Sequence, residues 1–305
     1  MKFKTVLESI GNTPLVQILP SPSRGTVLAK LEYLNPGGSI KDRTALYLIE
    51  KAEREGKLKP GGTIVEASSG NQGIALSMIG AVKGYRVIIT VPAKTSQEKV
   101  ATLKAFGAEV IVCPTTPDLH DPKGYHALAE KLHAEIEGSF MPDQYHNKNN
   151  REAHYASTGP EIWSQTGGAL THLFVGMGTC GTASGVARYL RERKPNIQVI
   201  AVDALGSHLS SNPPFAYTIE GIGVDVLDGN YAPELLDEVI AVSDEETFEM
   251  TRQLGRRYGL MGGLSSGAVM CAIERCKERL DKDSVAVAMF ADSGRAYLGK
   301  IFVEK

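Results

Sequence analysis

Short apolar runs alternate with amphipathic segments along most of the chain. The runs are rich in β-branched residues and predict strands at residues 27–33, 63–66, 86–91, 109–112, 172–175, 198–202, 239–242 and 284–290. The amphipathic segments predict helices near residues 73–82, 96–106, 123–137, 151–165, 182–194, 244–258, 266–279 and 294–302. This alternation predicts an α/β fold with an open, mostly parallel sheet and helices on both faces.

One lysine lies at the start of a further predicted helix, behind the segment 35–40. Apolar residues follow it at helical spacing: Ala45, Leu48, Ile49 and Ala52. Ser39 suits the N-cap and Asp42 completes a capping-box-like pair, which places Lys41 at the second helical position. The positive end of a helix dipole disfavours a protonated amine, so Lys41 is a candidate Schiff-base nucleophile. Taken alone, the segment fits an ordinary surface lysine at least as well.

Two loops between a predicted strand and a predicted helix are suited to anions. Residues 66–73 combine hydroxyl side chains and glycine at a helix N-terminus, which predicts a carboxylate cradle, and Asn71 could bond a ring oxygen. Plain N-capping explains that loop about equally well. Residues 176–182 carry glycines with Thr179 and Thr182, which indicates a phosphate loop, but neither a P-loop nor a full dinucleotide fingerprint is present.

Two other loops, 262–267 and 292–297, indicate little by themselves. Because ligands of open α/β sheets bind at the carboxyl ends of strands, all four loops are expected on one rim. A lysine, a phosphate loop and a carboxylate cradle on one rim together indicate pyridoxal phosphate. The long stretch 206–231 lacks periodicity and fits a lid or substrate wall, or a disordered surface loop.

Composition excludes several other classes of protein. The chain has 305 residues, a formal net charge of −2 and no Lys/Arg run suited to nucleic acid or an anionic membrane. No apolar stretch reaches membrane-spanning length, and the N-terminus does not resemble a signal peptide. None of the four cysteines forms a CxxC pair, which favours a reduced, cytoplasmic protein, and the scattered histidines predict no metal site.

Four motifs in order resemble the cysteine synthase/cystathionine β-synthase family, the β-family or fold-type II of pyridoxal-phosphate enzymes. They are Pro36-x-x-Ser39-x-Lys41-Asp42-Arg43, Ser68-Ser69-Gly70-Asn71, Gly178-Thr179-x-Gly181-Thr182 and Ser265-Ser266-Gly267. The resemblance covers nearly the whole chain as a catalytic core. It implies a tryptophan synthase β-like fold of two twisted sheets with the cofactor between two domains. The smaller, mobile domain would span 38–147, and the larger would contain 1–37 and 148–305. A homodimer is also implied, and a serine acetyltransferase partner stays open.

The same resemblance assigns roles by position. Lys41 is implied as the Schiff-base lysine and proton shuttle at Cα, Asn71 as the partner of the cofactor's 3′-oxygen, and Ser265 as the partner of its ring nitrogen. The implied phosphate ligands are Gly178, Thr179, Cys180, Gly181 and Thr182. The implied substrate contacts are Ser68, Ser69, Gly70, Gln72, Gln144, Glu220 and Gly221. The family usually has glycine at Cys180 and threonine at Gln72, so a positive φ at Cys180 would cost energy and Gln72 makes the amino-acid specificity uncertain.

The implied reaction is β-replacement on a serine-type amino acid through an aminoacrylate. Cysteine synthesis from O-acetyl-L-serine and sulfide is the primary expectation, with small-molecule amino acid and thiol substrates. Glu220 in Glu220-Gly221-Ile222-Gly223 resembles the cystathionine branch, so cystathionine synthesis from homocysteine is the alternative. A second alternative is a lyase that releases sulfide from cysteine. A non-enzymatic paralogue is a third class, which the presence of Lys41, Asn71 and Ser265 argues against.

Overall fold

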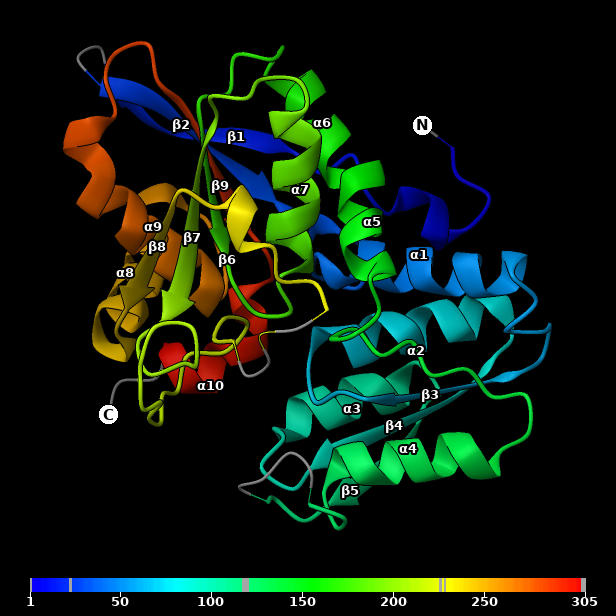
Figure 1. Cartoon of the computed structure of the whole chain (residues 1–305). Coiled ribbons are helices and arrows are strands. Elements are labelled where there is room, and N and C mark those ends of the chain that lie inside the picture. Colours follow the sequence, from blue (N-terminus) through cyan, green and yellow to red (C-terminus); the bar gives the residue numbers. More distant parts are fainter. Residues whose placement is uncertain (1, 22–23, 117–120, 225–226, 228, 303–305) are drawn as a thin grey trace.

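The computed structural model describes residues 2–21, 24–116, 121–224, 227 and 229–302. It contains two separate sheets rather than one (Figure 1). The larger has six strands in the order β1-β2-β9-β6-β7-β8, and the smaller has three in the order β3-β4-β5. All neighbouring strands pair in parallel except β1 and β2, which form an antiparallel edge.

The strands fall close to the apolar runs of the sequence. In the large sheet they are β1 (Leu15–Ser21), β2 (Arg24–Leu31), β6 (His172–Gly176), β7 (Gln198–Ala204), β8 (Glu238–Val242) and β9 (Val285–Phe290). In the small sheet they are β3 (Thr63–Ala67), β4 (Arg86–Pro92) and β5 (Glu109–Cys113). β1 was not predicted, and the run 27–33 turns into the 3₁₀ helix η2 (Glu32–Leu34) after β2.

Helices cover both faces of each sheet. They are α1 (Lys41–Arg54), α2 (Asn71–Lys83), α3 (Gln97–Ala105), α4 (Tyr125–Glu135), α5 (Asn149–Ala156), α6 (Thr158–Gln165), α7 (Gly181–Arg191), α8 (Asp244–Tyr258), α9 (Leu264–Cys276) and α10 (Leu298–Ile301). Short 3₁₀ helices are η1 (Val6–Ser9), η3 (Pro233–Leu235), η4 (Lys277–Arg279) and η5 (Gly294–Tyr297). The single helix predicted over 151–165 is wrong, because the backbone breaks at Ser157, with φ −129° and ψ −66°, between α5 and α6.

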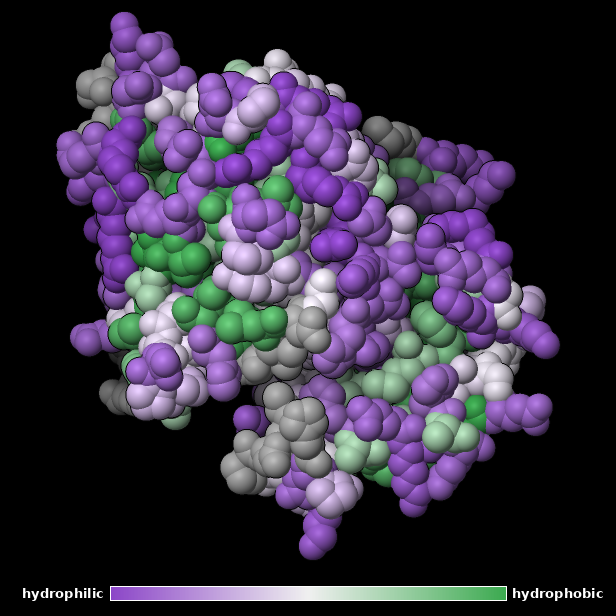
Figure 2. Space-filling view, in the orientation of Figure 1, coloured by the Kyte–Doolittle hydropathy of each residue, from purple (hydrophilic) through white to green (hydrophobic). Residues whose placement is uncertain are grey.

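Four buried clusters hold these layers together. In the large sheet, α8 and α9 cover one face and α6 and α7 cover the other. In the small sheet, α1, α2 and α3 contribute to one cluster and α4 to the other. Burial of apolar surface at roughly 25 cal/mol per Å² is the main stabilising contribution of such clusters. The face shown in Figure 2 is correspondingly mostly hydrophilic, with separate apolar patches.

The chain passes between the sheets twice. It leaves the large sheet after β2, builds the small sheet, and returns through α5 and α6 to β6. α1 packs on both α2 and α5, and Figure 1 shows it running between the two halves. In the described part of the chain, no helix is long and apolar enough to cross a membrane.

Candidate active site

The segment that follows β9 brings two of the motifs together. The Ile40 N–H donates to the carbonyl oxygen of Ala291 at 2.8 Å, and the Gly263 N–H donates to that of Asp292 at 2.9 Å. Residues 291–293 therefore lie between the chain that starts α1 and the chain that starts α9. This pairing places Lys41 and Ser265 on two sides of the same strand end.

Lys41 is the first residue of α1, and its ammonium lies next to the predicted phosphate loop. Its Nζ is 3.4 Å from Thr179 Oγ1. Burial lowers the pKa of Lys41 to about 8, although Cys180 and Asp292 nearby oppose the shift. A pKa near neutrality allows the amine to act as a nucleophile and to accept and return a proton.

The predicted capping box at α1 is wrong. Lys41 occupies the first helical position, and the helix has no side-chain cap at its N-cap residue, Ile40. Ser39 bridges to the chain beside β9, and its Oγ accepts from the Lys41 N–H at 3.2 Å. Asp42 accepts instead from the Gly37 N–H at 2.6 Å, because the turn before the helix leaves that donor free.

The loop from β6 to α7 has the shape expected of an anion site. α7 begins at Gly181, so its first N–H groups have no partner within the helix. Cys180 adopts the left-handed conformation, with φ 62° and ψ −7°, as the N-cap. This strain is typically about 1–2 kcal/mol for a residue with a side chain. The buried thiol does not become a nucleophile, because burial raises the pKa of Cys180 to about 12.

Ser265 lies in the first turn of α9 with its hydroxyl buried. Its Oγ has no hydrogen-bond partner among the described residues. A Cβ added to Gly221 would lie 3.5 Å from the Ser265 Cβ, and one added to Gly178 would lie 3.2 Å from the Gly221 carbonyl oxygen. Gly221 thus approaches Ser265 closely, and Gly178 approaches Gly221. A buried hydroxyl without a partner is costly, and a ring nitrogen would supply one.

The cradle at the start of α2 combines a capped helix with open polar groups. Ser68 Oγ accepts from the Gly73 N–H at 3.0 Å, so the hydroxyl proton of Ser68 is free to donate. Gln72 is only 1% exposed, and neither its amide oxygen nor its amide nitrogen has a partner among the described residues. Asn71 Nδ2 donates to Asp292 Oδ2 at 2.8 Å. Tyr297 donates to the same oxygen at 2.5 Å.

Gln144 reaches this region through its backbone. Its N–H lies 3.5 Å from Glu66 Oε1 on β3, and the N–H of Asp143 donates to Glu66 Oε2 at 2.9 Å. Burial raises the pKa of Glu66 to about 8, although these backbone donors oppose the shift. Glu66 therefore joins the strand that carries the cradle to the segment that carries Gln144.

Glu220 lies between two lysines from different parts of the chain. It accepts from Lys99 on α3, and from Lys300 on α10 at 2.9 Å. Lys99 also lies over the ring of Tyr297, 5.1 Å from its centroid. These contacts connect the small-sheet half to the large-sheet half. Lys99 could not be assigned a role from its position in the sequence, because 121 residues separate it from Glu220.

Two buried residues on α5, Asn150 and His154, complete the site, and neither was predicted to belong to it. Asn150 Nδ2 donates to Thr179 Oγ1 at 3.0 Å, and His154 Nε2 lies 3.2 Å from Thr182 Oγ1. Asn150 lies in a polar, asparagine-rich stretch without periodicity. Their four-residue spacing, which puts them on one helix face, was the only available signal.

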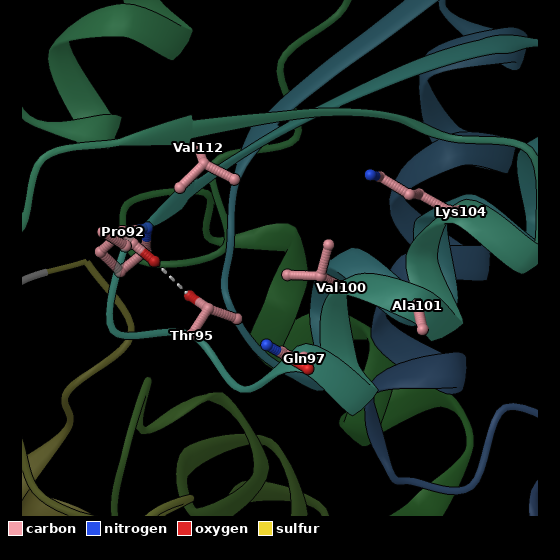
Figure 3. Close-up of a pocket in the computed structure, with 8 residues that line it drawn as sticks. Pro92, Thr95, Gln97, Val100, Ala101, Lys104 and Val112 are labelled. Carbon is pink, nitrogen blue, oxygen red and sulfur yellow. Dashed lines mark hydrogen bonds between the residues drawn. The ribbon is translucent and has the colours of Figure 1, made fainter.

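A surface pocket of about 390 Å³ lies elsewhere, on the small sheet. Figure 3 shows its lining from β4, the following turn, α3 and β5, with Val100 and Val112 facing it and Thr95 bonded to Pro92. It contains no residue of the four motifs. The candidate active site is therefore the set of strand-end loops rather than this pocket.

Two mostly parallel sheets flanked by helices, a lysine with a pKa of about 8 beside a phosphate-type loop, and a buried serine hydroxyl without a partner define a pyridoxal-phosphate enzyme of fold-type II. The sequence profile described as "Pyridoxal-phosphate dependent enzyme" matches residues 6–292. The chain belongs to this pyridoxal-phosphate dependent family and is of the cysteine synthase/cystathionine β-synthase type.

Among curated proteins, the chain is similar to cysteine synthase B of Pseudomonas aeruginosa, with 40% identity over 98% of this chain and 97% of that protein. It is 42% identical to the cystathionine beta-synthase of Apis mellifera over 98% of this chain. That match covers only 61% of the Apis mellifera protein, and the matching yeast enzyme is covered to 62%. The chain thus spans about three fifths of the length of these cystathionine beta-synthases.

Among solved structures, the chain resembles the O-acetylserine dependent cystathionine beta-synthase of Helicobacter pylori, with a TM-score of 0.92 and 38% identity. That match covers 99% of this chain and 100% of the other. It also resembles a hydrogen sulfide-producing enzyme of Fusobacterium nucleatum, with a TM-score of 0.91, 37% identity and coverage of 98% and 99%. These matches agree on the fold and the family while their names differ in reaction.

Proposed function

We propose that the protein catalyses β-replacement on a serine-type amino acid and is most specifically a cysteine synthase, which converts O-acetyl-L-serine and sulfide to L-cysteine and acetate. The observation that carries this proposal is the position of Lys41 Nζ, 3.4 Å from Thr179 of the phosphate-type loop. When bound, pyridoxal phosphate supplies an electron-withdrawing ring that acidifies Cα–H and allows the β-substituent to leave.

The residues present fit this cofactor. Lys41 would attach it covalently and carry the Cα proton, and the open hydroxyl of Ser265 would bond its ring nitrogen. Asn71 would bond its ring oxygen. The phosphate would be held by the loop residues Gly178, Thr179, Cys180, Gly181 and Thr182. An uncharged hydroxyl partner such as Ser265 would leave the ring nitrogen largely neutral, which would favour proton removal by Lys41 together with departure of the β-substituent.

The substrate's α-carboxylate would lie at the start of α2. The helix N-terminus supplies free N–H groups, and Ser68 retains a hydroxyl proton to donate. The proposed contacts in this region are Ser68, Ser69, Gly70, Gln72 and Gln144. We propose Glu220 and Gly221 as contacts for the second substrate. Their loop lies against Ser265, because a Cβ added to Gly221 would be 3.5 Å from the Ser265 Cβ.

We propose that residues 38–147 form a mobile domain that closes on the larger one, 1–37 with 148–305. The contacts of Asn71 with Asp292 and of Lys99 with Glu220 support this, since both join the two halves. Closure would exclude water from the reacting group. A homodimer is part of the same proposal, and sedimentation equilibrium would measure the assembly.

Cystathionine synthesis from homocysteine is a second candidate. The supporting observation is that Glu220 is held between Lys99 and Lys300. Two cations around one carboxylate leave a positive surplus, which suits a second substrate with a carboxylate of its own. The name of the Helicobacter pylori neighbour is consistent with that reaction.

A product analysis of the cofactor-loaded enzyme tests the proposal. O-acetylserine, serine and cysteine are each combined with sulfide, with homocysteine or with no thiol, and products are measured by mass spectrometry. We expect the highest kcat/KM for O-acetylserine with sulfide. Dominant cystathionine formation would establish the second candidate instead, and sulfide release from cysteine alone would indicate a lyase.

A further inference from the structure

Two side chains on α5 touch Thr179, in the loop between β6 and α7, and Thr182, in the first turn of α7. Asn150 and His154 are four residues apart, so they lie on one face of the helix, and both are 0% exposed. Asn150 contacts Thr179, and His154 contacts Thr182. Both also contact Thr44 on α1, three residues after Lys41.

The amide of Asn150 can face only one way. Its Nδ2 lies 2.8 Å from the carbonyl oxygen of Gln144, which can only accept a hydrogen bond. The same nitrogen donates to Thr179 Oγ1 at 3.0 Å, and Lys41 Nζ is a second donor to that oxygen. With its lone pairs occupied by two donors, the Thr179 hydroxyl has its proton left for another acceptor.

The contacts of His154 also determine which ring nitrogen carries its proton. Thr44 Oγ1 donates to Asn150 Oδ1 at 3.4 Å, so it is an acceptor toward His154 Nε2, 3.1 Å away. Nε2 must then carry the hydrogen, and Nδ1 accepts from Thr158 Oγ1 at 2.8 Å. Burial and the positive charges of Lys41 and Arg43 lower the pKa of His154 well below its usual value, which keeps the ring neutral.

The Thr182 hydroxyl, 3.2 Å from His154 Nε2, then shares that one Nε2 hydrogen with Thr44 in a bifurcated hydrogen bond. Both threonines are therefore approached by donors from the α5 side. A hydroxyl that accepts on one side presents its proton on the other. The site thus offers two O–H donors together with the free N–H groups of α7. Neither threonine hydroxyl has to direct a lone pair, which would be repelled, toward a bound anion.

We propose that Asn150 and His154 are positioning residues that set the polarity of the phosphate site, so that Thr179 and Thr182 both donate to the cofactor phosphate. This inference rests on the proposed role of the loop in holding pyridoxal phosphate. Because Thr44 shares the same two partners, the arrangement also ties the start of α1, and with it Lys41, to the phosphate loop.

The test compares apoenzyme affinity for pyridoxal phosphate with affinity for pyridoxal, which lacks the phosphate. The dissociation constant of pyridoxal divided by that of pyridoxal phosphate, both from absorbance titrations, measures what the phosphate contacts add to binding. Asn150→Asp replaces the donor with an acceptor of the same shape, and His154→Phe removes the donor. We expect each to lower the ratio about tenfold or more, the usual effect of losing a hydrogen bond to a charged group. His154→Gln, which can still donate, should lower it less.

Matched variants separate the possible failures. Thr44→Val removes the acceptor from which the His154 proton is assigned but leaves the imidazole in place, so it should lower the ratio less than His154→Phe does. If Thr179→Val and Thr182→Val leave the ratio unchanged, the proposed phosphate loop is wrong. If those two lower the ratio while Asn150→Asp and His154→Phe do not, the positioning role is wrong.

A measurement on the unsubstituted protein covers the case of a variant that does not fold. ¹⁵N NMR of the histidine ring distinguishes a protonated Nε2 from a protonated Nδ1. We expect the Nε2–H form for His154 in both the apoenzyme and the loaded enzyme. A stable Nδ1–H form would overturn the assignment, because Thr182 would then have to donate to the histidine.

Discussion

Gly181→Ala should destabilise the protein strongly although alanine is the better helix former. A Cβ at this position would lie 2.1 Å from Oδ1 of Asn150 and 2.4 Å from its Cγ. The Asn150 side chain would have to move by about 1 Å to reach normal contact distance. It would then lose its hydrogen bonds to the Gln144 carbonyl and to Thr179, now 2.8 and 3.0 Å.

The magnitude follows from these contacts. Two lost hydrogen bonds cost about 1 kcal/mol each, and a buried amide left partly unpaired costs about 1–3 kcal/mol more. Alanine in place of glycine in a helix returns about 0.5–1 kcal/mol. We expect a net decrease of about 2–4 kcal/mol in the free energy of unfolding, measured by urea denaturation with an unchanged m-value.

A double-mutant cycle identifies the cause. In an Asn150→Ala background the clashing atoms are absent, so Gly181→Ala should cost less than about 0.5 kcal/mol. Gly255→Ala on α8 is the control, because a Cβ there meets nothing within 4 Å, and it should stabilise by about 0.5–1 kcal/mol. An equal cost of Gly181→Ala in both backgrounds would refute the reasoning.

Three further predictions concern charge. In the apoenzyme, the rate of amine acylation at Lys41, followed by peptide mass spectrometry, should rise with a midpoint near pH 8, and a midpoint near 10 would contradict its burial. Because the folded-state pKa of Glu66 is raised to about 8, the folded state favours its protonated form and loses stability as pH rises from about 4.5 to 8. Glu66→Gln should therefore gain stability relative to the unsubstituted protein across that window in urea unfolding, and a constant difference would count against it. Lys99→Ala should speed limited proteolysis between the two halves, while Lys94→Ala, which has no ion pair among those identified, should not.

The sequence predicted most of the fold because its strands are buried on both sides. The runs at 86–91 and 284–290 match β4 and β9 within one residue, since continuous apolar stretches bounded by polar residues leave little freedom. β1 was missed because it is an antiparallel edge strand interrupted by Pro20. The break at Ser157 was missed because apolar spacing continues through it from α5 to α6.

The candidate site was predictable where its chemistry is local. Lys41, Thr179 and Ser265 lie in short motifs that indicate little singly but are informative together and in their order along the chain. Asn150 and His154 were not predictable, because their meaning depends on contacts with Thr179 and Thr182, 29 and 28 residues away. The α1 cap was mispredicted because tertiary pairing of Ser39 with the β9 side replaced a local motif.

The hydrogen bond between Thr44 and Asn150 joins the two places where the chain crosses between the sheets. In the proposed closure, this contact between the two crossing segments would act as the hinge. A rotation of the small sheet about this point would displace groups in proportion to their distance from it. We expect Lys41, at the start of α1, to move little, while α3, beyond α2 in Figure 1, moves farther. In the proposed closure, groups far from this contact would separate while Lys41 keeps its place.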